Sequence, residues 1–229
     1  MNRDVQQNRR AFLAVAGAAA AGAALSAGAQ EPAPAGPVRI LAISCSPRPG
    51  MTTAAGLGIA LEGVRSFGRS RVETELIELA GKNIPVFNPA SADLGDFAGL
   101  IPKLSDPAVR GIIVGTPVYF CGMSSLCKAF LDQCMAFRKG GMLLRNKVAG
   151  ALAVGGVRNG GQELAIAGVQ AGLMCQEMIV VGDGRPSAHT GATLLNTDDS
   201  IDKDEFGRET ARNLGRHVAE VAFLLAGRA

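Results

Sequence analysis

Short apolar runs alternate along the chain with longer segments in which apolar residues recur every three or four positions. The apolar runs are residues 38–44, 71–79, 111–116, 148–157 and 178–182, and runs of this length predict strands. The helical spacing covers residues 53–67, 94–104, 123–137, 161–175 and 205–225. Each predicted strand is therefore followed by a predicted helix, which gives five strand–helix units.

The residue types in these runs indicate how the strands are arranged. Residues 38–44 and 111–116 are rich in Val, Ile and Leu with little polar alternation, which is typical of strands buried on both faces. Such strands, alternating with helices, predict an α/β doubly wound five-stranded parallel sheet with helices on both faces. Five units fit the strand order 2-1-3-4-5, although the sequence does not encode the order. Ligands of such sheets bind beyond the carboxyl ends of the strands, so we expect functional residues just after strands one, three and four.

The first 37 residues have a different character. Arg9 and Arg10 precede an apolar stretch rich in Ala and Gly, which ends at Ala27-Gly28-Ala29. This layout predicts a cleaved signal peptide of the twin-arginine type over residues 1–29, with an uncleaved membrane anchor as the alternative. Residues 30–37 contain three prolines and predict a Pro-rich linker, so the folded domain is expected over 38–229. The protein is then exported to the periplasm in folded form.

The composition and net charge argue against nucleic-acid binding and against a His-rich metal site. Apolar residues make up 48% of the 229 residues and charged residues 19%, which is enough to build a core. The net charge of +3 falls to +1 when residues 1–29 are removed, and no basic stripe or Trp is present, so nucleic acid is not an expected partner. Two His in the whole chain exclude a His-rich metal site.

Residues 44–53 join the first predicted strand to the first predicted helix. A helix N-terminus favours an anion, and Ser46, Arg48, Thr52 and Thr53 add hydroxyl groups and a positive charge. An ordinary capped turn is the alternative, because Ser and Thr cap helices routinely. The sequence contains no Walker loop and no G-x-G-x-x-G fingerprint, and Met51 stands where a C-x5-R phosphatase needs Arg. The group as a whole favours a phosphate site.

The loops after the third and fourth predicted strands also carry unusual sequence. Residues 116–125 hold Tyr119 beside Phe120, on which a flat aromatic ligand can rest, although Phe120 alone would also suit a core. Residues 155–161 include four Gly, which would expose backbone amides to a ligand or simply make the loop flexible.

Three motifs in order carry a family resemblance: Ser46-Pro-Arg with Thr52-Thr53, Thr116-Pro-Val-Tyr-Phe through Lys128-Ala-Phe-Leu-Asp132, and Gly155-Gly-Val-Arg-Asn-Gly-Gly-Gln-Glu163. Over about residues 38–182 the chain resembles the NADPH-dependent FMN reductase family of flavodoxin-like proteins, and most nearly its iron–sulfur flavoprotein branch. The resemblance implies that the first loop holds the FMN phosphate and that the other two flank the isoalloxazine ring. The implied FMN-binding residues are Ser46, Arg48, Thr52, Thr53, Pro117, Val118, Tyr119, Phe120, Cys121, Gly122, Gly156, Val157, Arg158, Asn159, Gly160 and Gly161.

Two departures from the family pattern affect these expectations. Thr52 stands where the family often has Asn, but it still offers a donor. The iron–sulfur branch carries a compact Cys cluster in the loop after the second strand, whereas residues 81–92 here contain no Cys, so we expect the cluster to be missing.

The Cys and His residues give weaker signals. The five Cys form no C-x-x-C pair, and Cys127 and Cys134 are seven apart on one predicted helix, which is typical of small core residues. A contact between Cys121 and the flavin is left open. His189 either faces the substrate or is a solvated loop residue, and His217 is expected at the surface. No catalytic residue is assigned, because flavin chemistry belongs to the cofactor.

These observations predict an exported FMN-dependent oxidoreductase of NAD(P)H:acceptor or quinone reductase type. The alternative is a flavodoxin-type electron carrier without a small-molecule substrate, and a flavin-free binding module is a third class. The expected partners are an electron donor, either NAD(P)H or a quinol, a quinone-like acceptor, and further copies of the chain in a dimer or tetramer.

Overall fold

The computed structural model describes residues 38–68 and 71–227, so the predicted signal peptide (1–29) and linker (30–37) lie outside the described residues. The strands are β1 Val38–Ser44, β2 Val72–Glu78, β3 Val109–Tyr119, β4 Gly122–Met123, β5 Val148–Gly155, β6 Ile179–Val180 and β7 Ala192–Leu195. The helices are α2 Thr52–Gly68, the 3-10 helix η2 Gly95–Leu100, α3 Ile101–Ser105, α4 Ser125–Gln133, α5 Met135–Lys139, α6 Gln162–Met174 and α7 Glu205–Leu225.

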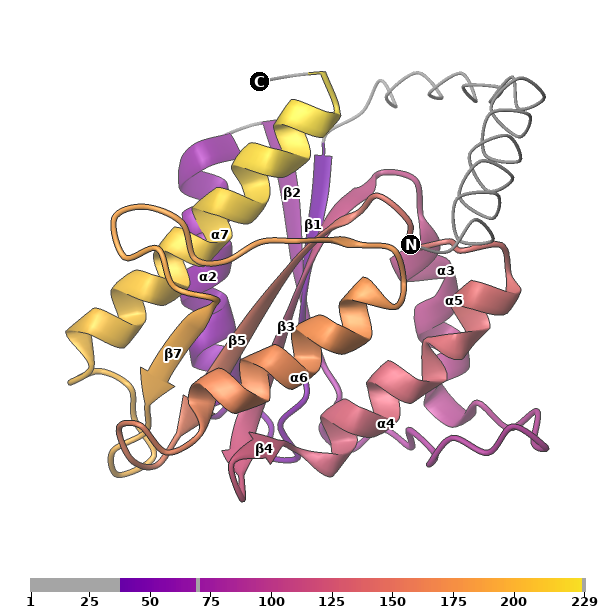
Figure 1. Cartoon of the computed structure of the whole chain (residues 1–229), viewed down its shortest axis with the longest axis horizontal. Helices are drawn as coiled ribbons and strands as arrows, with labels where there is room; N and C mark the ends of the chain where they lie inside the picture. Colours follow the sequence, from indigo (N-terminus) through magenta and orange to yellow (C-terminus); the bar gives the residue numbers. More distant parts are fainter. Residues whose placement is uncertain (1–37, 69–70, 228–229) are drawn as a thin grey trace, which may run out of the picture. The chain divides into compact units, whose positions relative to one another are not determined.

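The strands form one sheet in the order β2-β1-β3-β5-β6, all of them parallel (Figure 1). These are the five predicted strands in the predicted order 2-1-3-4-5, and the doubly wound fold is confirmed. Two strands are additional: β4 pairs antiparallel with β3, and β7 pairs parallel with β5. Beside β5, β6 pairs with Val148 and Ala149 and β7 pairs with Leu152 to Gly155, so the outermost position is shared by two short strands.

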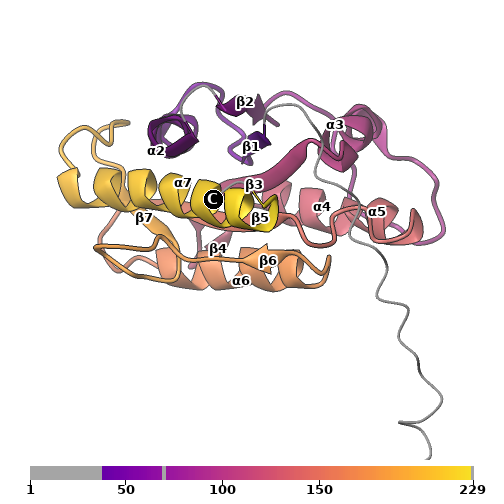
Figure 2. The ribbon, with the colours of Figure 1, turned by 90° about the horizontal axis from the view of Figure 1, so that it is seen from above.

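Helices cover both faces of the sheet, and alternate strand residues point to each layer. Helices α2 and α7 pack against each other on one face, where Leu57 and Val218 lie against the strand glycines Gly115 and Gly111. Helices α4 and α6 pack on the other face, and Figure 2 shows α2 and α6 on opposite sides of the strands. Glycine lets α2 and α7 approach closely, since a Cβ at Gly215 would lie 1.8 Å from the carbonyl oxygen of Ala60.

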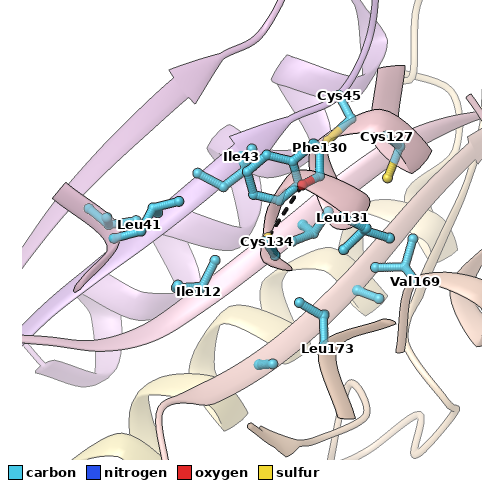
Figure 3. Packing of buried hydrophobic residues seen from close by; sticks show 14 of the residues in the cluster. Leu41, Ile43, Cys45, Ile112, Cys127, Phe130, Leu131, Cys134, Val169 and Leu173 are labelled. Carbon is cyan, nitrogen blue, oxygen red and sulfur yellow. Dashed lines mark hydrogen bonds between the residues drawn. The ribbon is translucent and has the colours of Figure 1, made fainter. Parts of the chain in front are cut away.

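The core on the α4 side contains three thiols, those of Cys45, Cys127 and Cys134, among Ile43, Phe130 and Leu131 (Figure 3). The Cys134 thiol donates to the carbonyl of Phe130 at 3.3 Å. Burial raises the pKa of the Cys45 thiol well above its ordinary value and also raises the pKa of the Cys134 thiol. The Cys45 and Cys134 thiols therefore stay protonated. Cys127 and Cys134 are buried, so the prediction that they are core residues is confirmed.

Several predicted boundaries were wrong. The helix predicted over 123–137 begins at Ser125, because residues 122–123 form β4, and it is interrupted at Cys134, which separates α4 from α5. The helix predicted over 94–104 is a 3-10 turn followed by one short α-helix with a proline in its first turn. The third strand continues beyond residue 116 to Tyr119, the fourth ends at Gly155, and the fifth contains only Ile179 and Val180.

Lys147 lies at the amino end of β5, on the sheet edge opposite the predicted site. Its side chain is buried, and Nζ donates to the carbonyl oxygens of Asp106 at 2.7 Å and Val109 at 2.6 Å. Burial and, to a lesser extent, repulsion from Arg110 outweigh the attraction of Asp106 and lower the pKa of Lys147 to about 8. Within the described ranges, no helix has the length and apolar character needed to cross a membrane.

We expect the free energy of unfolding to rise between about pH 8 and pH 10 through Lys147. In this window the folded chain has released the Lys147 proton and the unfolded chain still binds it, so stability increases with pH. Urea denaturation across this range should show the free energy of unfolding of the wild type rising by about 1–3 kcal/mol more than that of Lys147→Met. Lys139→Met, at an exposed position, is the control for losing one charge. Parallel pH profiles for the wild type and Lys147→Met would contradict the prediction.

Candidate functional site

The first predicted loop connects β1 to the N-terminus of α2. The Ser46 hydroxyl accepts from the backbone N–H of Arg48 at 3.1 Å, which closes a tight turn. Ser46, Thr52 and Thr53 are all at most 6% exposed, whereas residues 47–50 are exposed. The first turn of the 17-residue α2 contains no acidic residue. The loop thus places three hydroxyl groups and one guanidinium at the positive end of a helix.

Two carboxylates already bond to donors of this loop. Arg48 Nη1 lies 2.8 Å from Oδ1 of Asp199, and the backbone N–H of Gly50 donates to Oε2 of Glu78 at 2.8 Å. The hydrogen bond from Arg48 lowers the pKa of Asp199. Arg48 and the Gly50 N–H can therefore each bind an anionic oxygen, and together with the hydroxyl groups of the loop they suit a phosphate group.

The second predicted loop is a β-hairpin. Val118 pairs with Met123 and Tyr119 with Gly122, which leaves Phe120 and Cys121 as the two turn residues. Both have a left-handed backbone, with φ of 49° and 61°, as a type I′ turn requires. Asn and Gly are the usual residues at such positions, and strained residues of this kind cost about 1–3 kcal/mol each. The prediction that residues 116–125 form a loop was wrong for residues 116–119, which belong to β3, and for residues 122–123, which form β4.

Ser124 joins the hairpin to the first loop. Its hydroxyl donates to the carbonyl of Cys45 at 2.7 Å and accepts from the N–H of Cys127 at 3.1 Å, as the N-cap of α4. Its own N–H donates to the hydroxyl of Thr116 at 3.0 Å. Sequence reasoning did not assign a role to Ser124, although a Ser directly before a periodic apolar segment is an N-cap signal.

The third predicted loop is closed by Gln162, which is 1% exposed. Its side-chain oxygen accepts from the N–H of Gly160 at 2.9 Å, and its Nε2 donates to the carbonyl of Val157 at 2.8 Å. The expectation that all the glycines of this loop offer free amides was therefore wrong for Gly160. Gln162 gives the loop a defined shape, which a merely flexible linker would lack.

Gly161 brings the second and third loops into contact. Its φ is +104°, and a Cβ built on it would lie 2.5 Å from the Cα of Cys121. Any side chain here would collide with the backbone of the hairpin turn as well as strain its own backbone.

Arg158 is held by a buried carboxylate. Its Nη2 lies 2.5 Å from Oδ1 of Asp204, whose side chain is 4% exposed and also accepts from the N–H groups of Leu195 and Gly207. Asp204 is the N-cap of α7, so Arg158 is tied to the start of that helix. Sequence reasoning did not identify Asp204, although it stands directly before the predicted helix at 205–225.

The three loops lie at the carboxyl ends of β1, β3 and β5, at one edge of the sheet (Figure 1). The first loop supplies polar donors, and the hairpin and third loop supply exposed apolar side chains: Tyr119 is 46%, Phe120 105% and Val157 65% exposed. Buried hydroxyls with a cation beside an exposed aromatic surface fit a ligand that has a phosphate at one end and a flat ring at the other.

Neither His is simply a solvated surface residue. His189 is half-exposed, with Nδ1 3.5 Å from the buried carboxylate of Asp183. His217 is partly buried, with Nδ1 2.9 Å from the carbonyl oxygen of Gly182, so the expectation of a surface His217 holds only in part. Among the residues that the structure describes, no group of three or more His, Cys, Asp or Glu could hold a metal ion.

We expect Gly161→Ala to lower the free energy of unfolding by about 2 kcal/mol or more, because Ala at a positive φ is strained and its Cβ meets Cys121. Urea denaturation measures the loss. Gly156→Ala is the matched control in the same loop, because a Cβ there meets nothing within 4 Å, and its effect should stay within about 0.5 kcal/mol. Equal stabilities of the two variants would show that the hairpin does not depend on Gly161.

Comparisons with known proteins agree with this arrangement. The sequence pattern of the NADPH-dependent FMN reductase family matches residues 38–193. An iron–sulfur flavoprotein of Methanocaldococcus jannaschii is 39% identical over 199 residues, which cover 82% of this chain and 99% of that protein. An NAD(P)H dehydrogenase (quinone) of Paracoccus denitrificans is 37% identical over 137 residues, 51% of this chain and 64% of that protein.

A solved structure of an NADH:FMN oxidoreductase in its apo form superposes on the chain with a TM-score of 0.56 at 25% identity, covering 80% of this chain and 89% of that one. The matched region contains β1 to β7 as far as Thr193, and with them all three loops of the site. The chain belongs to the NADPH-dependent FMN reductase family, and it is an FMN-dependent oxidoreductase with a flavodoxin-like fold.

Proposed function

We propose that this oxidoreductase passes electrons to a quinone-type acceptor, that it is exported in folded form, and that its FMN lies across the three loops. The observation that carries the proposal is the juxtaposition, at one sheet edge, of the polar helix N-terminus of the first loop with the exposed aromatic hairpin. Similarity to an NAD(P)H dehydrogenase (quinone) supports the acceptor class.

FMN supplies the redox chemistry when bound, and the chain's own residues hold it and shape its surroundings. Ser46, Thr52 and Thr53 would hold the phosphate through their hydroxyls, together with the N–H groups at the start of α2. The hairpin residues 117–122 and the loop residues 156–161 would flank the ring, with Tyr119 and Phe120 supplying aromatic surface. The contact of Gly161 with Cys121 fixes the relative position of these two walls.

Arg48 is free to exchange partners. Its side chain is 47% exposed and that of Asp199 is 55% exposed, and ion pairs between solvated groups contribute little to stability. A phosphate at the start of α2 can therefore attract the guanidinium away from Asp199, or share it, at little cost. Arg158, tied to a buried carboxylate, lacks this freedom and serves better as a fixed wall of the ring site.

The export proposal bears on the electron donor. Residues 1–29 read as a twin-arginine signal, and a free NAD(P)H pool is not expected outside the cytoplasm. The chain also lacks a G-x-G-x-x-G fingerprint for a dinucleotide. We therefore propose a quinol or a redox protein as the physiological donor, with NAD(P)H reacting only weakly.

Self-association is a further part of the proposal. Phe120 at the hairpin tip and Leu164 on α6 are exposed apolar side chains close to the site, and a second copy of the chain would cover such surface. Light scattering that shows a stable monomer at micromolar concentration with full flavin occupancy would contradict it.

Arg48→Ala combined with Thr53→Ala should weaken FMN binding by about tenfold or more, because a charge-assisted contact and a hydroxyl donor to the phosphate are lost. Riboflavin lacks the phosphate, so its dissociation constant should change little. Fluorescence titration of flavin-depleted protein gives both constants. Arg65→Ala, in the last turn of the same helix, is the charge-matched control. A double variant that binds FMN like the wild type would place the phosphate elsewhere.

Stopped-flow reduction of the bound flavin tests the donor. We expect quinols to reduce it faster than NADPH does, since no residues of the chain form a dinucleotide fingerprint. Cell fractionation with and without residues 1–29 tests the export. Rapid, saturable reduction by micromolar NADPH without reduction by quinols would refute the donor proposal. Reoxidation by proteins but never by quinones would instead support a flavodoxin-type electron carrier.

A further inference from the structure

A cavity of about 640 Å³ lies beside the third loop. Its lining includes Arg158 and Asn159 of the third loop, Glu163 at the start of α6, His189 of the 183–191 segment and Phe206 of α7. Because Arg158 and Asn159 also belong to the proposed flavin site, this cavity and the ring site share a wall.

His189 is oriented by a buried carboxylate. Asp183 is 0% exposed, and its carboxylate accepts from the hydroxyl of Ser187 at 2.5 Å and from the backbone N–H of His189. The same carboxylate lies 3.5 Å from Nδ1 of the His189 ring. A carboxylate that faces Nδ1 favours the proton on that nitrogen, which leaves Nε2, across the ring, for the cavity that His189 lines.

Phe206 completes an aromatic wall. Its ring meets that of His189 edge to face, with centroids 5.7 Å apart at 81°. Phe206 is 54% exposed although it lies in the first turn of α7, where the helix could have presented a polar residue. A planar ligand can therefore lie against Phe206 with a polar atom within reach of His189.

We propose that this cavity binds the quinone acceptor and that His189 donates a proton to it, an inference that rests on the proposed quinone reductase function. Reduction of a quinone to a hydroquinone takes two electrons and two protons. Reduced FMN, when bound, would supply both electrons and one proton as a hydride. The second proton passes from Nε2 of protonated His189 to the oxygen of the hydroquinone anion: the N–H bond breaks as the O–H bond forms, and neutral His189 regains a proton from water.

The binding half of the proposal is tested without turnover. Oxidised, FMN-loaded protein is titrated with menadione, a small quinone, by calorimetry, and no electron transfer occurs because no electron donor is present. Phe206→Ala should raise the dissociation constant by about tenfold, through loss of the aromatic wall. Leu224→Ala, an exposed position near the far end of α7, should leave it unchanged. Flavin absorbance checks that both variants keep FMN. An unchanged constant for Phe206→Ala would overturn the cavity as the quinone site.

The proton-donor half is tested by stopped-flow reoxidation of the chemically reduced enzyme in the absence of oxygen. Menadione needs a proton and ferricyanide does not, so His189→Gln should slow reoxidation by menadione about 10- to 100-fold and leave ferricyanide unaffected. The backbone bond from residue 189 to Asp183 is kept in this variant. Equal menadione rates for the variant and the wild type would overturn the role of His189.

The pH profile separates a proton donor from a structural residue. His189 faces Asp183 and Ser187 from its own segment, Phe206 from α7, and Glu163 and Arg158 around the cavity, with Arg158 already paired to Asp204. The wild-type menadione rate should fall as the pH rises, since the protonated ring is the donor, and His189→Gln should lose this fall. Identical pH profiles would overturn the proposal. If reduced wild-type enzyme reacts with ferricyanide but not with menadione, the proposed function itself fails, and this inference fails with it.

Discussion

The site depends on one buried hydroxyl, that of Ser124. The hydroxyl bonds to Cys45 and Cys127, and the backbone N–H of the same residue bonds to the Thr116 hydroxyl, so Ser124 connects the end of β1, the start of α4 and the carboxyl part of β3. The end of β1 lies 79 residues from Ser124 in the sequence, and the Cys45 carbonyl and the Cys127 N–H are buried polar groups that need a partner. Ser124 is 2% exposed, so water cannot replace it. Ser124 therefore links the first loop to the base of the hairpin.

The hairpin in turn depends on the third loop. Phe120 and Cys121 occupy left-handed backbone positions that favour Gly and Asn, so the turn is unfavourable on its own. The close approach of Gly161 to Cys121 and the closure of the third loop by Gln162 support it from the other side. A strained backbone of this kind persists where contacts from the surrounding structure hold it in place. Here it presents Phe120 fully to solvent beside a site for a flat ring.

The sequence predicted the strands, the parallel sheet and the three loops, because apolar runs and helical periodicity are local signals, whereas the strand order came from the fold class that five such units fit. It placed the start of the helix after the third strand two residues too early. The reason is that Tyr119 pairs with Gly122 in a hairpin, and the helical spacing of the apolar residues after it does not indicate this pairing. Asp199 and Asp204 were missed as partners of the site, because they lie 151 and 46 residues from Arg48 and Arg158. Spacing along the chain carries no sign of such pairs.

Asp199 and Asp204 both lie in the short segment between β7 and α7, but only Asp204 is buried. Their partners, Arg48 and Arg158, are therefore held to different degrees. Asp199 stands in solvent on a turn with a left-handed backbone, so its bond to Arg48 forms and breaks readily. Asp204 is buried and already accepts two backbone N–H groups, so releasing Arg158 would leave a desolvated charge without its counter-ion. The same segment therefore keeps the third loop rigid and leaves the first loop able to exchange one anion for another. A site that must hold the charged end of a cofactor while fixing the surroundings of its ring needs both properties, and this chain derives them from residues only five positions apart.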